Sequence, residues 1–129
     1  MTMTEDDFRT YVAAFNAADF DGFGRFYADD VVFELGSRKR IVGRDDILAF
    51  YRKVRAHLDE HIDLRGVLVG PRHVAMYCRT VFTTLVDWPD YEFGATVKGD
   101  VREVETIAWY DLDKGGQRFT HIRGGRFKP

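Results

Sequence analysis

Three tyrosines in the first half of the chain, Tyr11, Tyr27 and Tyr51, are the side chains best suited to chemistry. A buried phenol needs a hydrogen-bond partner, and neighbouring phenols polarise one another. If these hydroxyls point into an apolar cavity, a free donor would stabilise the oxygen of an enolate or a phenolate. The alternative is that all three are core residues whose hydroxyls bond backbone carbonyls.

Candidates for moving a proton are fewer. His57 ends a helical pattern, where its imidazole could overhang the mouth of a cavity and act as a general base near neutral pH. The same position also suits an exposed histidine at a helix C-terminus. Glu34 points away from the core face of a strand pattern by parity, so it is either a surface or interface carboxylate or, if a bulge shifts the strand by one residue, a group that can act in the cavity. The run Arg38-Lys39-Arg40 either attracts an anionic substrate or forms a solvated loop.

Metal, nucleotide and acyl-enzyme chemistry find no support in the sequence. The pair Asp29-Asp30 has no third ligand at a usable spacing, and capping and turn formation explain it better. A Gly-rich phosphate loop, HExxH, a CxxC pair and GxSxG are all missing. We therefore expect no metal and no cofactor.

Composition sets the class of protein. A chain of 129 residues that is 45% hydrophobic and 31% charged predicts one globular domain over residues 1–129. A net charge of −2 argues against binding nucleic acid through phosphates. The lone Cys78, an acidic N-terminus and the lack of any long apolar run predict a cytoplasmic protein without a membrane span. An aromatic fraction of 15% indicates either a bulky core or a ring-sized pocket.

Helical patterns come first along the chain. Thr4 is a good N-cap for a helix over 5–18, a shorter helix is expected over 21–27, and a third begins near Arg44 and extends to Leu58. Between them, 31–35 reads as a strand and 36–43 as a basic loop. After His61 the hydrophobic period changes to two, which predicts strands over 61–69, 73–87, 96–112 and 117–127.

These elements predict an α+β fold, in which about three N-terminal helices pack on a strongly curved, mostly antiparallel sheet and close one face of a cone. The turn over 87–91 either folds over the opening or is an ordinary hairpin tip. Parity divides the sheet residues into two faces. The helix-facing set is Ile62, Leu64, Gly66, Leu68, Met76, Cys78, Thr80, Phe82, Val104, Thr106, Ala108, Tyr110 and Ile122.

The opposite set mixes charged with large apolar side chains. It contains His61, Asp63, Arg65, Tyr77, Arg79, Val81, Glu103, Glu105, Ile107, Trp109 and His121. Arg79 is placed to pair with Glu103 or Glu105 across the strands. Such a mixture suits a subunit interface better than a solvated surface, so we expect a homodimer through this outer sheet face.

Several motifs resemble the N-terminal half of the nuclear-transport-factor-2-like superfamily, in its SnoaL-like and steroid ketoisomerase-like branches. They are Phe26-Tyr27-Ala28-Asp29-Asp30-Val31, Val42-Gly43-Arg44-Asp45-Asp46-Ile47 and Phe50-Tyr51-Arg52. The resemblance implies the same cone-shaped architecture, which is usually dimeric through its sheet. It leaves the reaction open, because this fold hosts isomerases, cyclases, dehydratases, hydrolases and non-catalytic binders.

The resemblance also assigns roles to the tyrosines. Tyr11 lies sixteen positions before Tyr27, which is the spacing of the oxyanion donor in the steroid isomerases, and Tyr27 and Tyr51 match the phenols that support it. The base of those enzymes falls on Leu35 and their second oxyanion donor near Thr106. Leucine cannot accept a proton, so the steroid isomerase reaction itself is not expected.

The resulting hypothesis is a cofactor-independent isomerase, cyclase or lyase that acts on a small apolar ring-containing carbonyl or phenolic compound. Tyr11, Tyr27, Tyr51 and His57 are its candidate catalytic residues. The expected cavity lining is Phe15, Phe33, Leu35, Met76, Phe82, Thr106 and Ala108. The alternative is a non-catalytic module of the same fold that binds a hydrophobic ligand or only dimerises, and Leu35 and Thr106 favour it.

Overall fold

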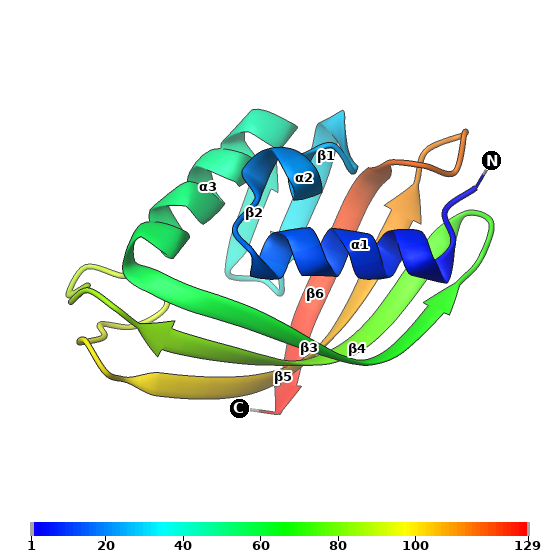
Figure 1. Ribbon diagram of the computed structural model, residues 1–129. Helices are drawn as coiled ribbons and strands as arrows, with labels where there is room; N and C mark the ends of the chain where they lie inside the picture. Colours follow the sequence, from blue (N-terminus) through cyan, green and yellow to red (C-terminus); the bar gives the residue numbers. More distant parts are fainter. Residues whose placement is uncertain (1, 129) are drawn as a thin grey trace.

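A computed structural model describes residues 2–128, with only the backbone of residue 128. Three helices lie on one side of a curled, unclosed sheet of six strands, as Figure 1 shows. The helices are α1 (Glu5–Asn16), α2 (Phe20–Gly24) and α3 (Arg44–His57). The strands are β1 (Tyr27–Leu35), β2 (Lys39–Val42), β3 (Leu58–Val69), β4 (His73–Thr84), β5 (Val101–Leu112) and β6 (Phe119–Lys128).

The sheet has the strand order β2-β1-β6-β5-β4-β3. Every neighbouring pair is antiparallel except β1 and β6, which are parallel. The predicted α+β cone with a mostly antiparallel sheet is therefore confirmed. No helix among the described residues has the length and apolar character needed to cross a membrane.

Helix α1 begins where the sequence places it. The Thr4 hydroxyl accepts a hydrogen bond from the Asp7 amide, and the Asp7 carboxylate accepts one from the Thr4 amide, which together form a capping box. The predicted apolar stripe is buried through Phe8, Tyr11 and Phe15. The stripe faces the inside of the curl, so the first candidate tyrosine is positioned by ordinary amphipathic packing.

Two short segments differ from the sequence-based expectation. The second helix covers Phe20–Gly24 rather than 21–27, because the Asp19 side chain caps it at the Gly22 amide and Tyr27 already belongs to β1 beside Phe119 of β6. The expected basic loop over 36–43 contains strand β2, which pairs with β1 at Phe33↔Ile41. Basic residues on a short edge strand are common, because they discourage further strand pairing.

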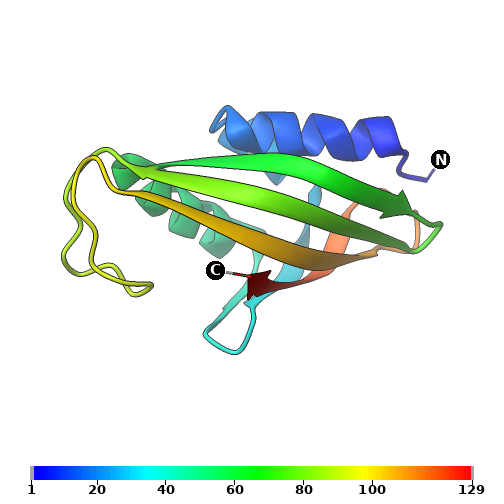
Figure 2. The ribbon, with the colours of Figure 1, turned by 90° about the horizontal axis from the view of Figure 1, so that it is seen from below.

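The long strands β3, β4 and β5 run side by side under α1 (Figure 2). Strands β4 and β5 are shorter than predicted, ending at Thr84 and beginning at Val101. The segment 85–100 between them is a loop held by a single bridge, Trp88↔Thr96, and by a 2.6 Å hydrogen bond between the hydroxyls of Thr84 and Thr96.

The predicted inner face of β3 is wrong at its C-terminal end. A β-bulge lies between Leu64 and Gly66, so the pairing resumes as Gly66↔Tyr77 and Val67↔Met76. Beyond the bulge, the extra residue turns outward the positions that would have faced the helices, and turns their neighbours inward. Leu68, predicted to face the helices, is therefore 77% exposed, and Val67 packs against the core instead.

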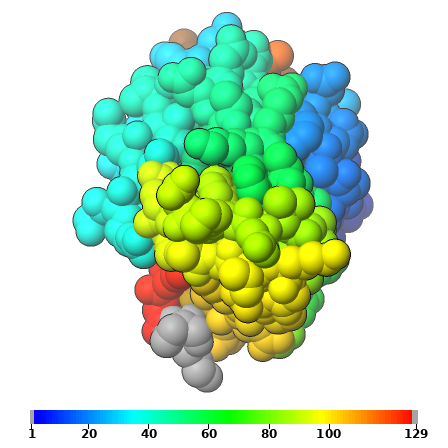
Figure 3. Space-filling model, turned by 90° about the vertical axis from the view of Figure 1, so that its left-hand side faces the viewer, coloured from blue at the N-terminus to red at the C-terminus, as the bar shows by residue number. Residues whose placement is uncertain are grey.

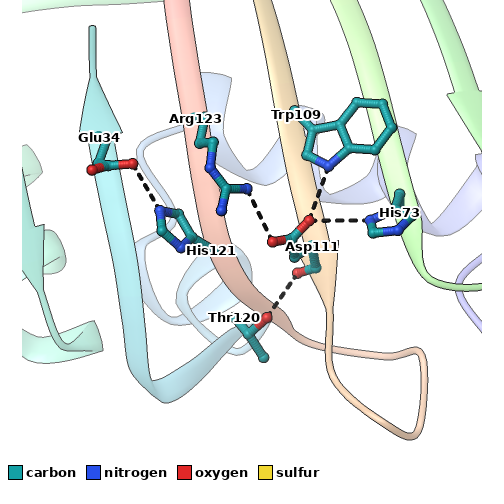
Figure 4. Close-up of polar contacts among 7 residues, drawn as sticks. All are labelled: Glu34, His73, Trp109, Asp111, Thr120, His121 and Arg123. Carbon is teal, nitrogen blue, oxygen red and sulfur yellow. Dashed lines mark hydrogen bonds and ion pairs between the residues drawn. The ribbon is translucent and has the colours of Figure 1, made fainter. Parts of the chain in front are cut away.

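The outer face of the sheet has the predicted mixture of side chains. Arg79 forms its ion pair with Glu103. Figure 4 shows a network centred on Asp111, whose Oδ1 accepts hydrogen bonds from Trp109 at 2.9 Å and lies 3.1 Å from His73 Nδ1. Glu34 lies on this face too, as parity predicted, 2.8 Å from the His121 ring.

A partly buried arginine joins the helices to the start of β3. The Arg55 guanidinium donates hydrogen bonds to the backbone carbonyls of Phe15 at 2.9 Å, Asn16 at 3.0 Å and Glu60 at 3.1 Å. The Asn16 side chain adds two more, donating to the carbonyl of Ile62 at 2.9 Å and accepting from its amide at 2.7 Å. We call Arg55 and Asn16 the α1–β3 clamp.

Replacing Arg55 by Met should lower the free energy of unfolding by about 2–4 kcal/mol, because three carbonyls lose a charged donor while the aliphatic stem remains. Urea denaturation followed by circular dichroism measures this. Arg52→Met is the matched control, since Arg52 on the same helix only covers the Phe20 ring at 5.0 Å. Equal losses for the two variants would contradict the clamp.

Candidate active site

A cavity of about 370 Å³ lies between the helices and the inner face of the sheet. This volume is at the small end of the range for ligand sites, and it can hold one small ring-containing molecule. The lining includes every residue that the sequence proposed for it: Phe15, Phe33, Leu35, Met76, Phe82, Thr106 and Ala108.

Phenol hydroxyls meet at this cavity. Tyr11 lines it, and its hydroxyl oxygen lies 2.9 Å from that of Tyr27, which stands behind Tyr11 and does not line the cavity. Tyr110 also hydrogen-bonds the Tyr11 hydroxyl, so the proton of Tyr11 is free for a ligand when Tyr27 and Tyr110 both donate to it. Tyr51 and Tyr110 also line the cavity. Within residues 2–128, no protein group bonds the Tyr51 hydroxyl, so Tyr51 is not part of the Tyr11–Tyr27 pair.

Burial keeps these phenols neutral. Desolvation is the main cause that raises the pKa of Tyr11, Tyr51 and Tyr110 above the usual 10.0. A phenol with a raised pKa stays protonated across the physiological range. The hydroxyls are therefore hydrogen-bond donors at neutral pH, which is the state that stabilises a developing oxyanion.

Aromatic rings build the wall behind the hydroxyls. The ring of Tyr11 lies 5.0 Å from that of Phe119 and 5.5 Å from that of Phe26, both edge to face. The ring of Tyr51 meets Phe15 edge to face, also at 5.0 Å. These rigid contacts fix the direction of each hydroxyl, and they account for the high aromatic content of the chain.

Exposed lining residues mark the mouth of the cavity between the β1–β2 turn and the end of β6. They are Gly36, Ser37, Arg38, Gly125 and Arg126. The segment 85–100 lies beside this turn: Arg38 donates to the Glu92 carbonyl at 3.1 Å, and Lys39 forms an ion pair with the Glu92 carboxylate at 2.9 Å. Figure 3 shows this segment, in yellow, next to the cyan turn.

The structure does not bring His57 to the cavity. Its Nδ1 lies 2.9 Å from the Lys53 carbonyl oxygen, and its ring stacks on Trp88 with centroids 4.2 Å apart. Trp88 stacks in turn on Tyr91 at 4.0 Å, and it is Tyr91 that lines the cavity. His57 is thus separated from a ligand by two rings, because the segment 85–100 covers the end of α3.

A carboxylate that the sequence analysis missed lines the cavity. Glu60 lies on the inner face of β3, two positions before the buried Ile62. Its side chain is partly accessible through the cavity but otherwise surrounded by protein, and this desolvation raises its pKa from the usual 4.5 to about 7. Arg55 and Arg126 act in the opposite direction through their charges.

Alternation along β3 places Glu60 on the same face as the buried Ile62, so the sequence pattern could have identified it. The sequence predicts a strand that begins at 61, which leaves Glu60 outside the strand face that Ile62 occupies. Strand β3 in fact starts at Leu58, directly after α3. Within residues 2–128, no cluster of three His, Cys, Asp or Glu side chains is arranged to hold a metal ion.

Comparison with known proteins gives a family match. Residues 8–122 match the family described as the SnoaL-like domain. A search of curated proteins finds no significant match.

Solved structures share the fold. A protein provisionally named a polyketide cyclase from Pseudomonas putida is 23% identical, with a TM-score of 0.80 over 96% of this chain and 90% of the other. A ketosteroid isomerase-like protein from Erwinia carotovora is 19% identical, with a TM-score of 0.64 over 94% and 91%. An epoxide hydrolase from M. tuberculosis is 15% identical, with a TM-score of 0.73 over 92% and 78%.

Glu60→Gln should stabilise the protein at high pH. A raised pKa in the folded state means that ionised Glu60 opposes folding above pH 7, by up to about 3 kcal/mol. The advantage of the variant should be complete above pH 7, shrink as the pH falls toward 4.5 and vanish below it. Urea denaturation of both proteins at several pH values measures the difference. A difference independent of pH would contradict the raised pKa.

Proposed function

The chain belongs to the SnoaL-like domain family, and on this basis we propose that it is a cofactor-independent isomerase, cyclase or lyase for a small apolar ring-containing carbonyl or phenolic compound. The supporting observation is the neutral phenol pair of Tyr11 and Tyr27 at the wall of an apolar cavity. All three reactions move a proton beside an oxygen whose negative charge must be stabilised.

The proposed role of Tyr11 is to donate a hydrogen bond to the substrate oxygen, with Tyr27 polarising it from behind. Tyr51 supplies a second hydroxyl to the same cavity. Donors of this kind stabilise the oxygen more strongly in a water-poor site than in bulk solvent. Phe15, Phe33 and Leu35 would hold the ring of the substrate by apolar contact.

A non-catalytic ligand-binding module is the second candidate. Leu35 and Thr106 line the cavity at the positions where the resemblance to steroid isomerases would place acids. A cavity without those acids still binds an apolar ring by burial alone. Binding of ring compounds without any turnover would favour this second function.

Tyr11→Phe should lower turnover of a ring ketone or phenol substrate at least tenfold, because the oxygen loses its donor while the shape of the cavity is kept. Screening ring ketones and phenols for turnover by chromatography identifies the substrate for this test. Tyr77→Phe is the matched control, since the Tyr77 hydroxyl lies on the outer sheet face and bonds Glu105. Unchanged turnover in Tyr11→Phe would remove Tyr11 from the mechanism.

We also propose that two copies of the chain associate through the outer sheet face. Ile107 is 54% exposed and Trp109 44% exposed on neighbouring positions of this face, beside the Asp111 network. An apolar centre surrounded by polar groups is the usual composition of a subunit interface.

Ile107→Glu should convert the dimer to monomers in light scattering coupled to size-exclusion chromatography, because it buries a charge at the proposed contact. Leu85→Glu is the control, since Leu85 is 51% exposed but lies in the segment 85–100 outside the sheet. A wild-type protein that is monomeric at all concentrations would refute this assembly.

A further inference from the structure

Resting on the proposed function, we propose that Glu60 is the general base of the cavity. Its carboxylate takes a proton from the carbon next to the carbonyl group of a bound ring ketone, while a tyrosine hydroxyl holds the carbonyl oxygen. His57, the base candidate from the sequence, is separated from the cavity, and the position that the resemblance assigns to a base is Leu35.

Glu60 lies among mostly apolar side chains, with Arg126 as a charged neighbour in the cavity lining. Its neighbours on the inner face of β3 are Leu58 and Ile62, both buried, and its cross-strand partner is Phe82. Among the described residues that line the cavity, it is the only carboxylate. A carboxylate in such surroundings costs free energy, so the fold gains nothing from keeping it there for packing.

The carboxylate has no protein partner to neutralise it. Within residues 2–128, no group donates a hydrogen bond to it and no ion pair includes it. Arg55 approaches from behind, but its hydrogen bonds go to the Glu60 carbonyl oxygen and to the Asp59 side chain. The lone pairs of the Glu60 carboxylate therefore remain available inside the cavity.

The backbone at Glu60 is fixed, although its carboxylate is free. The α1–β3 clamp holds the backbone of Glu60 and of the strand just after it, through the Glu60 carbonyl at 3.1 Å from Arg55 and through Ile62 bonded to Asn16. A base works only when its distance to the reacting carbon is held constant. The clamp limits the movement of the backbone that carries Glu60 and leaves the carboxylate unbonded.

The charge of Glu60 also affects the pKa values of other residues that line the cavity. It contributes to raising the pKa of Tyr11, Tyr51, Cys78 and Tyr91. The charged and titratable groups that influence Glu60 are few: Arg55 on α3 and Arg126 on β6 lower its pKa, and Asp59 on β3 raises it. With a pKa raised to about 7, Glu60 titrates near neutral pH and is a stronger base than an exposed glutamate.

The proposed step balances within the cavity. The electron pair of the carbon–hydrogen bond becomes the second bond of the enolate, and the carbonyl π pair moves to the oxygen held by the phenol. Glu60 becomes a carboxylic acid. Protonated Glu60 can return the proton to a different carbon of a conjugated enolate, which completes an isomerisation. If the proton first exchanges with solvent and then returns to the original carbon, the result is isotope exchange.

Isotope exchange tests this step with simple probes. The full chain is incubated in D₂O with 2-indanone or 2-tetralone, and loss of the hydrogens next to the carbonyl is followed by proton NMR against a protein-free blank. Glu60→Gln should slow the protein-catalysed exchange by about 10²–10⁴-fold, and Glu60→Asp by less, because its carboxylate is retained. Asp63→Asn is the matched control, since Asp63 on the same strand is exposed and pairs with Arg65.

The pH profile and ligand binding supply a second readout. The exchange rate of the wild type should rise with pH through about 7 and level off above it, because the ionised carboxylate is the active form. This inflection should disappear in Glu60→Gln, while calorimetric binding of 2-naphthol stays within a fewfold of the wild type.

The outcomes separate the two proposals. If the wild type catalyses exchange and Glu60→Gln catalyses it at the same rate, Glu60 is not the base, and the proposed function stands. Binding of the ring compounds with no exchange by the wild type would overturn the proposed enzymatic function, and the role of Glu60 with it. Loss of both exchange and binding in a folded Glu60→Gln variant would make Glu60 a binding group rather than the base.

Discussion

The cavity between the helices and the curled sheet stays open only because the side chains around it cannot move together to fill it. A cavity of about 370 Å³ removes the contacts that its walls would make in a filled core. The walls must therefore be held apart by rigid parts. Edge-to-face rings around Tyr11 and Tyr51 do this on the helix side, and the α1–β3 clamp of Arg55 and Asn16 does it where the helices meet β3.

The removal of water from the side chains that line the cavity has two chemical consequences. It raises the pKa of the tyrosines, which keeps them neutral and able to donate hydrogen bonds. It also raises the pKa of Glu60 to about 7, which makes its carboxylate a better proton acceptor. The proposed oxyanion donor and the proposed base therefore depend on one physical cause.

The period of two along the strands separates the site from the proposed assembly surface. Met76 and Ala108 face the cavity, and the alternating residues Ile107 and Trp109 face outward. Changes on one face therefore leave the other largely unaltered. The bulge between Leu64 and Gly66 is the exception, because it exchanges the faces of β3 and turns Leu68 outward.

The sequence predicts the elements of the α+β cone, the capped start of α1 and the apolar lining through capping and hydrophobic periodicity, whereas the expectation that the tyrosines line a cavity rests on its resemblance to a known family. It did not determine where β3 begins, the edge strand β2, the bulge, or the extent of the segment 85–100. Each of these depends on partners distant in the chain. Glu60 faces the cavity because β3 begins at Leu58, where it pairs with Thr84, and His57 lies outside the cavity because Trp88 of the segment 85–100 stacks on its ring; in both cases the deciding partner is distant in the chain, where local periodicity cannot indicate it.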